Sequence, residues 1–401
     1  MIEFTKLIRG EGTVSEAMKY RKASPHQVPS EFIRFTETRR PVVFWNTTNE
    51  CNLSCIHCYL NAGPSNRRKN ELSLKEAKEF LDDLSNMHIP LLMFTGGEPL
   101  VRKDFWELAS YASSKGLKTA ISTNGTLITK NVAKKIKDNG VEYAGVSLDG
   151  ADEKTHDNFR NQLGSFRTAV QGLKNCVETG LKCGVRITAT KYNYREIPNL
   201  IDLSIKLKIP RFCLYWLVPS GRGVKLFAEN NIGNSEIVQT LDTLYRKTKA
   251  TDPEQIEILS VDAPQDGVYI LNQLKREDAE KYEEACKLLE FTGGPCSAAD
   301  RLGNVDPSGN VYACQFAQLP ELRIGNIREK PFSEIWKDVE NPVLSMFRGK
   351  VKKLKGKCGE CNYNKLCGGG CRIRAYAKYT DFWAEDPFCP YNPNRENFET
   401  A

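Results

Sequence analysis

The stretch CNLSCIHC at residues 51–58 decides how this sequence is interpreted, because it spaces three cysteines as C-x3-C-x2-C directly after an apolar run. The thiolates of Cys51, Cys55 and Cys58 can hold three corners of a [4Fe–4S] cluster, since thiolate is the usual protein ligand of such clusters. The fourth iron would have no protein ligand and could bind and cleave a small molecule. A zinc site is the alternative, but structural zinc prefers four closed ligands, and no second C-x2-C pair lies nearby.

The composition favours an enzyme of a reducing compartment. The chain has 401 residues, a length that suggests about two domains. Its fourteen cysteines, without an export signal at the N-terminus, favour bound metal over disulfides and predict a cytoplasmic setting. No apolar stretch could span a bilayer, and no nucleic-acid motif occurs. The net charge of +7 permits an anionic substrate, and we expect no membrane or nucleic-acid partner.

Strand-like and helix-like segments alternate from residue 41 onward. The predicted strands are 42–46, 91–95, 118–122, 143–148, 183–190 and 212–218, and the predicted helices are 73–87, 104–115, 129–139, 165–179 and 197–208. Ser73 with Glu76 forms a capping box, and Gly116, Gly140 and Gly180 are placed as left-handed helix ends. Six such units imply an α/β fold with a parallel sheet, either a curved partial (β/α)6 barrel or an open doubly wound sheet.

Polar and glycine-rich residues follow successive predicted strands. Because parallel strands end at one edge of the sheet, these residues should meet there. They are the cysteine triplet, Gly96-Gly97-Glu98-Pro99, Ser122 with Asn124, Ser147 with Asp149, and 219–223, while Arg186 lies on the fifth strand.

The cysteine triplet together with the motif at 96–99 resembles the radical S-adenosylmethionine (SAM) superfamily over residues 40–220. The resemblance implies a partial (β/α)6 barrel in which the open iron chelates SAM. One electron then cleaves the sulfonium, and the resulting 5′-deoxyadenosyl radical takes a hydrogen atom from the substrate. The resemblance further implies an external electron donor such as ferredoxin or flavodoxin.

The same resemblance implies roles for residues along the strand ends. Gly96, Gly97 and Glu98, followed by Pro99, would bind the methionine amino group, and Ser122 and Asn124 the ribose or carboxylate region. Arg186 is a candidate for the SAM carboxylate, or else a surface arginine. The remaining SAM-binding candidates are His57 near adenine, Ser147, Asp149, and Leu217 with Val218, which could equally be core residues.

The last third of the chain is rich in cysteine. It contains Cys296, Cys314, Cys358, Cys361, Cys367, Cys371 and Cys389. Seven cysteines are too many for one zinc ion. Residues 306–310, which include Gly309, predict a hairpin turn before Cys314.

These cysteines resemble the SPASM extension of radical SAM enzymes, which binds auxiliary [4Fe–4S] clusters. The resemblance implies that Cys358, Cys361, Cys367 and Cys389 close one cluster, and that Cys296, Cys314 and Cys371 hold another. No eighth cysteine lies between Cys296 and Cys314, so the second cluster would have an open or non-cysteine position, or be absent. Cys286 is a possible substitute, although its helical surroundings favour a structural role.

We therefore divide the chain into an N-terminal extension (1–40), a radical SAM core (41–230), a helical linker region (231–290) and a SPASM-like iron–sulfur domain (291–401). The segments 2–7, 17–21, 40–46 and 383–387 resemble the tetrapyrrole-tailoring radical SAM proteins. That family implies an iron tetrapyrrole substrate. Residues 217–223 and 368–372 are most similar to the members that remove two acetate groups from 12,18-didecarboxysirohaem.

Such a substrate is a planar tetra-acid, so arginine guanidinium groups should bind its carboxylates through paired hydrogen bonds. Arg222, Arg301 and Arg160 are the candidates, each with a surface role as the alternative. Three other functions remain open. They are conversion of Fe-coproporphyrin III propionates to vinyls, maturation of a peptide or sulfatase, and non-catalytic electron transfer. The last leaves the motif at 96–99 unexplained.

Overall fold

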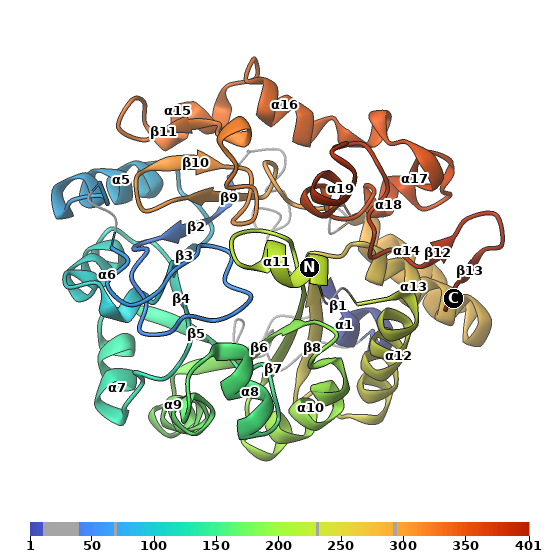
Figure 1. Cartoon of the computed structure of the whole chain (residues 1–401), viewed down its shortest axis with the longest axis horizontal. Coiled ribbons are helices and arrows are strands. Elements are labelled where there is room, and N and C mark those ends of the chain that lie inside the picture. Colours follow the sequence, from blue (N-terminus) through green and yellow to red (C-terminus); the bar gives the residue numbers. More distant parts are fainter. Residues whose placement is uncertain (11–39, 68–69, 230–231, 292–294, 401) are drawn as a thin grey trace.

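In the computed structural model, the described residues are 1–10, 40–67, 70–229, 232–291 and 295–400 (Figure 1). Most of the expected N-terminal extension, including the motif at 17–21, lies outside these ranges. A single eleven-stranded sheet organises the molecule, in the order β1-β8-β7-β6-β5-β4-β3-β2-β9-β10-β11. The sheet curves into a partial barrel with helices around its outer face (Figure 1).

The six predicted strands are confirmed, and they lie side by side in chain order. They are β2 (Val42–Asn46), β3 (Leu92–Thr95), β4 (Thr119–Thr123), β5 (Val141–Ser147), β6 (Lys182–Ala189) and β7 (Arg211–Trp216). Each pairs in parallel with the next. Their carboxyl ends therefore meet at one edge of the barrel, which excludes the doubly wound order.

The predicted helices are also confirmed, within two residues at each end. They are α5 (Leu74–Asn86), α6 (Phe105–Ser114), α7 (Lys130–Asp138), α9 (Ser165–Thr179) and α10 (Ile197–Lys206). Ser73 and Glu76 form both hydrogen bonds of the capping box. Gly116, Gly140 and Gly180 all have positive φ, as expected for left-handed helix ends.

The segment 231–290, expected to be a helical linker, contributes a strand to the sheet as well. Between α12 (Asn234–Ala250) and α13 (Gln265–Glu277) lies β8 (Glu257–Val261), parallel to β7. The N-terminal strand β1 (Ile2–Glu3) pairs antiparallel with β8, and α1 (Phe4–Arg9) packs against α12, α13 and α14 (Ala279–Phe291). A short apolar run between two long helices gave too little signal for this strand.

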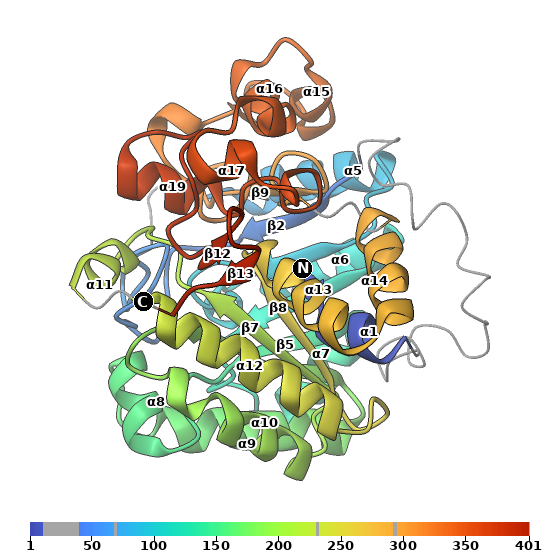
Figure 2. The same cartoon turned by 90° about the vertical axis from the view of Figure 1, so that its right-hand side faces the viewer.

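The cysteine-rich region continues the same sheet at its other edge. Strand β9 (Leu302–Val305) runs parallel to β2, and β10 (Asn310–Tyr312) and β11 (Gly325–Asn326) follow antiparallel. Gly309 has a φ of 86°, which confirms the predicted turn between β9 and β10. Both views place the following helices on this side of the barrel (Figures 1 and 2). They are α15 (Phe332–Lys337), α16 (Pro342–Arg348), α17 (Gly356–Glu360), α18 (Asn364–Cys367) and α19 (Arg372–Tyr379).

Two short helices lie near the strand ends. They are α8 (Glu153–Arg160), after β5, and α11 (Gly223–Glu229), after β7. Near the C-terminus, β12 (Tyr391–Asn392) and β13 (Asn397–Phe398) form a separate antiparallel hairpin. Among the described residues, no helix has both the length and the apolar composition needed to cross a membrane.

Candidate active site at the carboxyl ends of the strands

The cysteine loop, residues 50–63, follows β2 and folds back on itself. Its ends pair as an isolated bridge between Glu50 and Gly63, and the Cys51 N–H donates to the Gly63 carbonyl at 3.0 Å. Cys51 and Cys55 are buried, and Cys58 is half-buried. Burial, followed by the charge of Glu98, raises the pKa of the Cys51 thiol to about 12. Iron ligation must therefore displace this proton, because a thiol binds metal as its thiolate.

The glycine-rich loop at 96–99 packs directly against the backbone that leads into Cys51. The Gly97 N–H donates to the Thr48 carbonyl at 2.8 Å, and the Glu98 N–H to the Glu50 carbonyl at 2.9 Å. A Cβ at Gly97 would lie 2.0 Å from the Glu50 oxygen. Gly96 has a φ of 137°, which glycine adopts without strain. The two glycines thus permit a close approach to the backbone of residues 47–51, which leads into the cysteine loop.

The Glu98 carboxylate is fully buried and bonded to neighbouring loops. It accepts hydrogen bonds from the Thr123 hydroxyl at 2.9 Å, the Asn124 N–H at 2.9 Å and the Leu100 N–H at 3.2 Å. Burial nevertheless raises the pKa of Glu98 to about 7. The carboxylate joins the ends of β3 and β4, while Pro99, also buried, begins a 3-10 turn.

Asn124 connects the end of β4 to the first cysteine. Its amide nitrogen donates to the Asn52 side-chain oxygen at 2.8 Å and approaches the Cys51 sulfur at 3.8 Å. The predicted convergence of Glu98, Asn124 and Cys51 from three strand ends is what the structure contains.

Arg186 lies across the inner face of the barrel rather than on its outer surface. Its guanidinium donates to the Ser122 hydroxyl on β4 at 2.8 Å and approaches the Met93 sulfur on β3 at 3.9 Å. A Cβ at Gly145 would meet the same guanidinium at 2.2 Å. Ser147, at the end of β5, pairs with Arg186 in the sheet.

Asp149 and Arg160 form a buried ion pair beside the second cysteine. Asp149 also accepts from the Thr188 N–H at 2.8 Å, and the Arg160 guanidinium approaches the Cys55 sulfur at 3.6 Å. Burial raises the pKa of the Cys55 thiol, and Arg160 opposes that rise. The Arg160 guanidinium, which was predicted to bind a substrate carboxylate, therefore already contacts Asp149 and Cys55.

Arg222 supports the same loop from the other side. Its guanidinium donates to the carbonyls of Cys55 at 2.7 Å and Ala62 at 2.8 Å, and its N–H donates to the Cys58 carbonyl at 2.9 Å. Gly221, with positive φ, brings this backbone close to Cys58. Like Arg160, Arg222 holds the cysteine loop in place, a role that the sequence pattern did not indicate.

His57 stacks on Phe159, with ring centroids 4.2 Å apart. Burial, then Arg160 and Arg222, lowers the pKa of His57 well below its usual range, so the ring is neutral. Its buried Nδ1 has no hydrogen-bond partner. Leu217 and Val218 are buried in the main core, in agreement with the alternative that they are packing residues.

Four of the C-terminal cysteines line one cavity, between α13, α17, α18 and β12. Cys358, Cys361, Cys367 and Cys389 all contribute to its wall, and the cavity is narrow, with a volume of about 20 Å³. Burial, then Cys389 and Cys358, raises the pKa of Cys367 well above its usual range. This grouping matches the set expected for one auxiliary cluster.

The other three C-terminal cysteines form a second group. Cys314 follows β10, and Cys371 is the N-cap of α19. Burial, then Cys296 and Cys371, raises the pKa of the Cys314 thiol. Cys286 lies on α14. Burial raises the pKa of its thiol, a hydrogen bond with Tyr282 opposes that rise, and the charges of Glu283 and Glu290 add to it. Arg301 is close to this second group, and its guanidinium donates to the Pro295 carbonyl at 2.9 Å.

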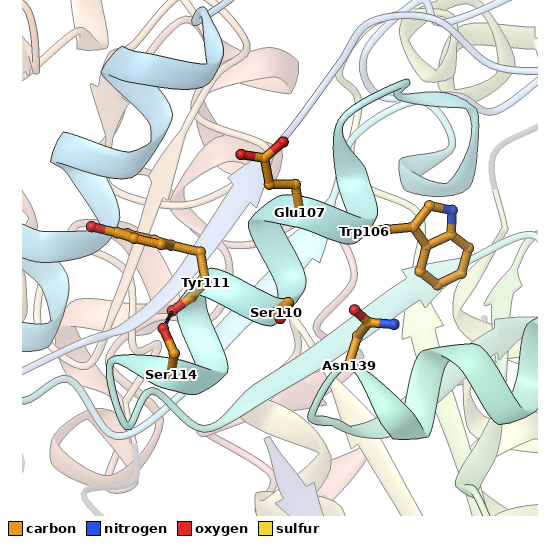
Figure 3. Close-up of a pocket in the computed structure, with 6 residues that line it drawn as sticks. All are labelled: Trp106, Glu107, Ser110, Tyr111, Ser114 and Asn139. Atoms are coloured by element: carbon orange, nitrogen blue, oxygen red, sulfur yellow. Dashed lines mark hydrogen bonds between the residues drawn. The ribbon is translucent and has the colours of Figure 1, made fainter.

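A different hollow lies on the outer helical layer, between α6 and the end of α7. It encloses about 410 Å³ and is lined by Trp106, Glu107, Ser110, Tyr111, Ser114 and Asn139 (Figure 3). It contains none of the expected site residues.

In the part of the chain that is described, no three His, Cys, Asp or Glu side chains converge as ligands of one ion would. The thiolates of a cubane each bind a different iron and so stand farther apart. A parallel barrel with three cysteines after its first core strand, and cysteine groups beside it, defines a radical SAM enzyme with auxiliary clusters.

Comparisons with known proteins agree with this class. The Radical SAM superfamily model matches residues 45–204, and the SPASM iron–sulfur cluster-binding domain model matches residues 296–362. The chain is 41% identical to "Fe-coproporphyrin III synthase" of Methanosarcina barkeri over 97% of both chains. It is 35% identical to "AdoMet-dependent heme synthase" of the same organism, over 88% of this chain and 97% of the relative. It is 34% identical to "Pre-heme d1 synthase" of Dinoroseobacter shibae, over 91% and 89%.

Among solved structures, SuiB of Streptococcus suis bound to S-adenosylmethionine has a TM-score of 0.68 at 19% identity, over 94% of this chain and 85% of that one, a likeness of fold. The chain belongs to the radical SAM enzymes of haem biosynthesis that carry a SPASM domain. It uses [4Fe–4S] clusters and SAM.

Proposed function

We propose that this enzyme removes two acetate side chains from 12,18-didecarboxysirohaem to give Fe-coproporphyrin III. The observation that carries the proposal is the gradient among relatives. Identity is 41% over 97% of both chains with the Fe-coproporphyrin III synthase, against 35% over 88% of this chain with the haem synthase. Haem synthase chemistry, which converts propionates to vinyls, is the second candidate because that relative also covers most of the chain.

Cys51, Cys55 and Cys58 would hold the SAM-binding cluster, which supplies reductive cleavage of SAM when it is bound. Because Gly97 and Glu98 bond the backbone before Cys51, they fix the orientation of the loop. Arg160 and Arg222 add cationic charge beside Cys55, and Arg222 also donates to the loop carbonyls of Cys55 and Ala62. These contacts would hold the three cysteines in a fixed arrangement, and a cluster bound by three thiolates would have one iron left to bind SAM.

The concave face of the barrel would bind SAM. Arg186 and Ser122 form a cation and hydroxyl pair that suits the SAM carboxylate. Gly96, Asn124, Ser147 and Asp149 surround the same edge, and His57 offers a neutral ring for stacking on adenine. Leu217 and Val218 would contribute only as the apolar floor.

Of the three arginines considered for the substrate, Arg160 and Arg222 contact the cysteine loop, and Arg301 lies beside Cys296 of the second cysteine group. Its side chain is 18% exposed and its guanidinium nitrogen lies 3.8 Å from Asp300. We assign it to a tetrapyrrole carboxylate. A protein electron donor such as ferredoxin or flavodoxin and an oxygen-poor, cytoplasmic setting complete the proposal, since open clusters oxidise readily.

The test is anaerobic incubation of the reconstituted, reduced protein with SAM and 12,18-didecarboxysirohaem, followed by mass spectrometry. We expect loss of two acetate groups together with 5′-deoxyadenosine. A parallel reaction contains Fe-coproporphyrin III. Formation of vinyl groups there, with unchanged didecarboxysirohaem, would assign the enzyme to haem synthesis instead.

A further inference from the structure

A strongly basic run of the sequence leads directly into one of the cysteine groups. Residues 348–357, with the sequence RGKVKKLKGK, contain six Lys and Arg residues and no Asp or Glu. The run ends immediately before Cys358, the first of the four cysteines that line one cavity. A positive surface beside a redox centre is suited to a negatively charged partner.

The two ends of this basic run are anchored to the fold. The Arg348 guanidinium donates to the carbonyls of Ala299 and Trp336, both at 2.8 Å. At the other end, the Lys357 ammonium donates to the Cys389 carbonyl at 2.6 Å, which ties the run to another cysteine of the same cavity. The two anchors therefore fix the course of the chain between them, beside that cavity.

Three lysines between the anchors are exposed to solvent, namely Lys352, Lys353 and Lys355. The Lys353 ammonium lies 5.1 Å from the centroid of the half-buried Trp383 ring, and the Lys355 N–H donates to the Trp383 carbonyl at 3.0 Å. Lys355 also forms an ion pair with Asp381 at 2.7 Å. Among the described residues, Lys352 has no ion-pair partner. The three lysines and the Trp383 ring together are called the lysine surface.

The cavity beside the lysine surface is suited to a cluster that passes electrons rather than one that binds substrate. Its four thiols, from Cys358, Cys361, Cys367 and Cys389, are a full ligand set for a cubane cluster, so no iron would be open to substrate. Cys361 and Cys389 are only half-buried, which brings this site close to solvent. Because electrons pass between proteins only over short distances, a donor protein must dock where a cluster lies near the surface.

The lysine surface fits an acidic protein better than a nucleic acid. It presents three lysines, one of which Asp381 already pairs, beside an aromatic ring. Binding to nucleic acid relies on many phosphate contacts along the strand. Electron-transfer complexes, in contrast, bury small interfaces, below about 1,200 Å², and complementary charge speeds their encounter. A small cationic surface next to a redox centre meets the needs of such a donor.

We propose that the lysine surface is the docking site of an acidic electron-donor protein, and that the cluster in the four-cysteine cavity receives its electron. The inference rests on the external donor of the proposed function, and it adds where that donor binds. In the transfer, the donor loses one electron and the oxidised cluster gains it, changing from [4Fe–4S]²⁺ to [4Fe–4S]⁺. No atom or proton is exchanged in this step.

The test measures electron transfer from fully reduced flavodoxin, an acidic donor, to the oxidised holoenzyme, by anaerobic stopped-flow absorbance of the flavin. The unaltered enzyme is compared with the double variant Lys352→Glu, Lys353→Glu and with the control Lys134→Glu, Lys174→Glu. The control lysines are exposed on α7 and α9, which lie on the far side of the barrel from α17 (Figures 1 and 2). Both double variants change the net charge equally, so that only the location differs.

At low salt we expect the second-order rate of the lysine-surface variant to fall about tenfold and to lose most of its salt dependence, while the control keeps the rate of the unaltered enzyme. Dithionite, a small reductant that needs no docking surface, should reduce all three proteins equally. If the lysine-surface variant loses iron, the milder pair Lys352→Gln, Lys353→Gln decides by the same criteria.

Equal rates in the two double variants would overturn the proposal, and so would the absence of transfer to the unaltered enzyme from both flavodoxin and an acidic ferredoxin. Loss of binding to a labelled single-stranded oligonucleotide in the lysine-surface variant, with unchanged flavodoxin rates, would assign the surface to nucleic acid instead. Because no tetrapyrrole is present, the outcome is independent of which substrate the enzyme converts.

Discussion

The two cysteine-bearing regions of this molecule gather their thiols in different ways. The cysteine loop takes all three from eight consecutive residues and is held by backbone bonds and by Arg160 and Arg222. The C-terminal region gathers seven cysteines from residues 296 to 389 through β10, α17, α18 and α19. Local spacing therefore organises the first site, whereas tertiary packing organises the others.

The largest effect is expected from Cys55→Ala. Loss of one of three ligands should remove the SAM-binding cluster and reduce SAM cleavage to the uncatalysed background. High-performance liquid chromatography of 5′-deoxyadenosine after reduction with dithionite measures it. The matched control is Cys286→Ala, a half-buried cysteine on α14, which should cleave SAM normally. A Cys55→Ala enzyme that still cleaves SAM would contradict the ligand assignment.

The C-terminal region should depend on one buried ion pair. Arg374 and Asp386 are both fully buried, and Asp386 also accepts from Cys371. Asp386→Asn removes the hydrogen-bonded counter-charge of the buried Arg374 and should destabilise the folded protein by about 3–5 kcal/mol. Thermal unfolding followed by circular dichroism measures this loss.

The control for that variant is Asp381→Asn, which removes an exposed ion pair to Lys355 in the same region and should cost about 0–1 kcal/mol. Equal losses in the two variants would show that packing of the C-terminal region does not rest on the buried pair.

In the cysteine loop, a smaller effect is expected from Gly97→Ala. The new methyl group would lie 2.0 Å from the Glu50 carbonyl oxygen and must displace the loop. A shift of about 1 Å at a reacting centre can cost about 10²-fold in rate, and we expect SAM cleavage to fall by that order. Gly63→Ala, in the same loop, has no atom within 4 Å of its Cβ and should keep its rate. Equal rates in both variants would mean that this close contact does not position the cysteines.

The smallest effect is a pH dependence of stability. Burial raises the pKa of Asp266, which accepts from the Trp216 indole at 2.8 Å, to about 7. An unfolded aspartate titrates near ~3.9, so between about pH 4 and 7 the folded state binds the extra proton and its stability falls as pH rises. Asp266→Asn should flatten the decrease in unfolding temperature from pH 5 to 7. Asp202→Asn, at an exposed pair with Lys247, should leave the slope unchanged, and an unchanged slope in Asp266→Asn would refute the assignment.

Much of the barrel was predictable because its signals are local. Apolar runs, the Ser73 capping box and glycines after helices located six strands and five helices, and the spacing of Cys51, Cys55 and Cys58 indicated the first site. The strand β8 was missed, since five residues between long helices carry no periodicity that distinguishes them.

The functions of the arginines could not be predicted, because they depend on contacts between distant segments. Arg160 and Arg222 looked suited to a substrate, but the fold places them against Cys55 from residues more than 100 apart in sequence.

The most direct test of the account is the iron and sulfide content of the anaerobically reconstituted chain and of three variants, each with one cysteine group changed to Ala. The account predicts about twelve irons for the unaltered chain and a loss of about four in each variant, since the three groups would hold separate [4Fe–4S] clusters. About eight irons in the unaltered chain, with no further loss when Cys314 and Cys371 are replaced, would contradict it.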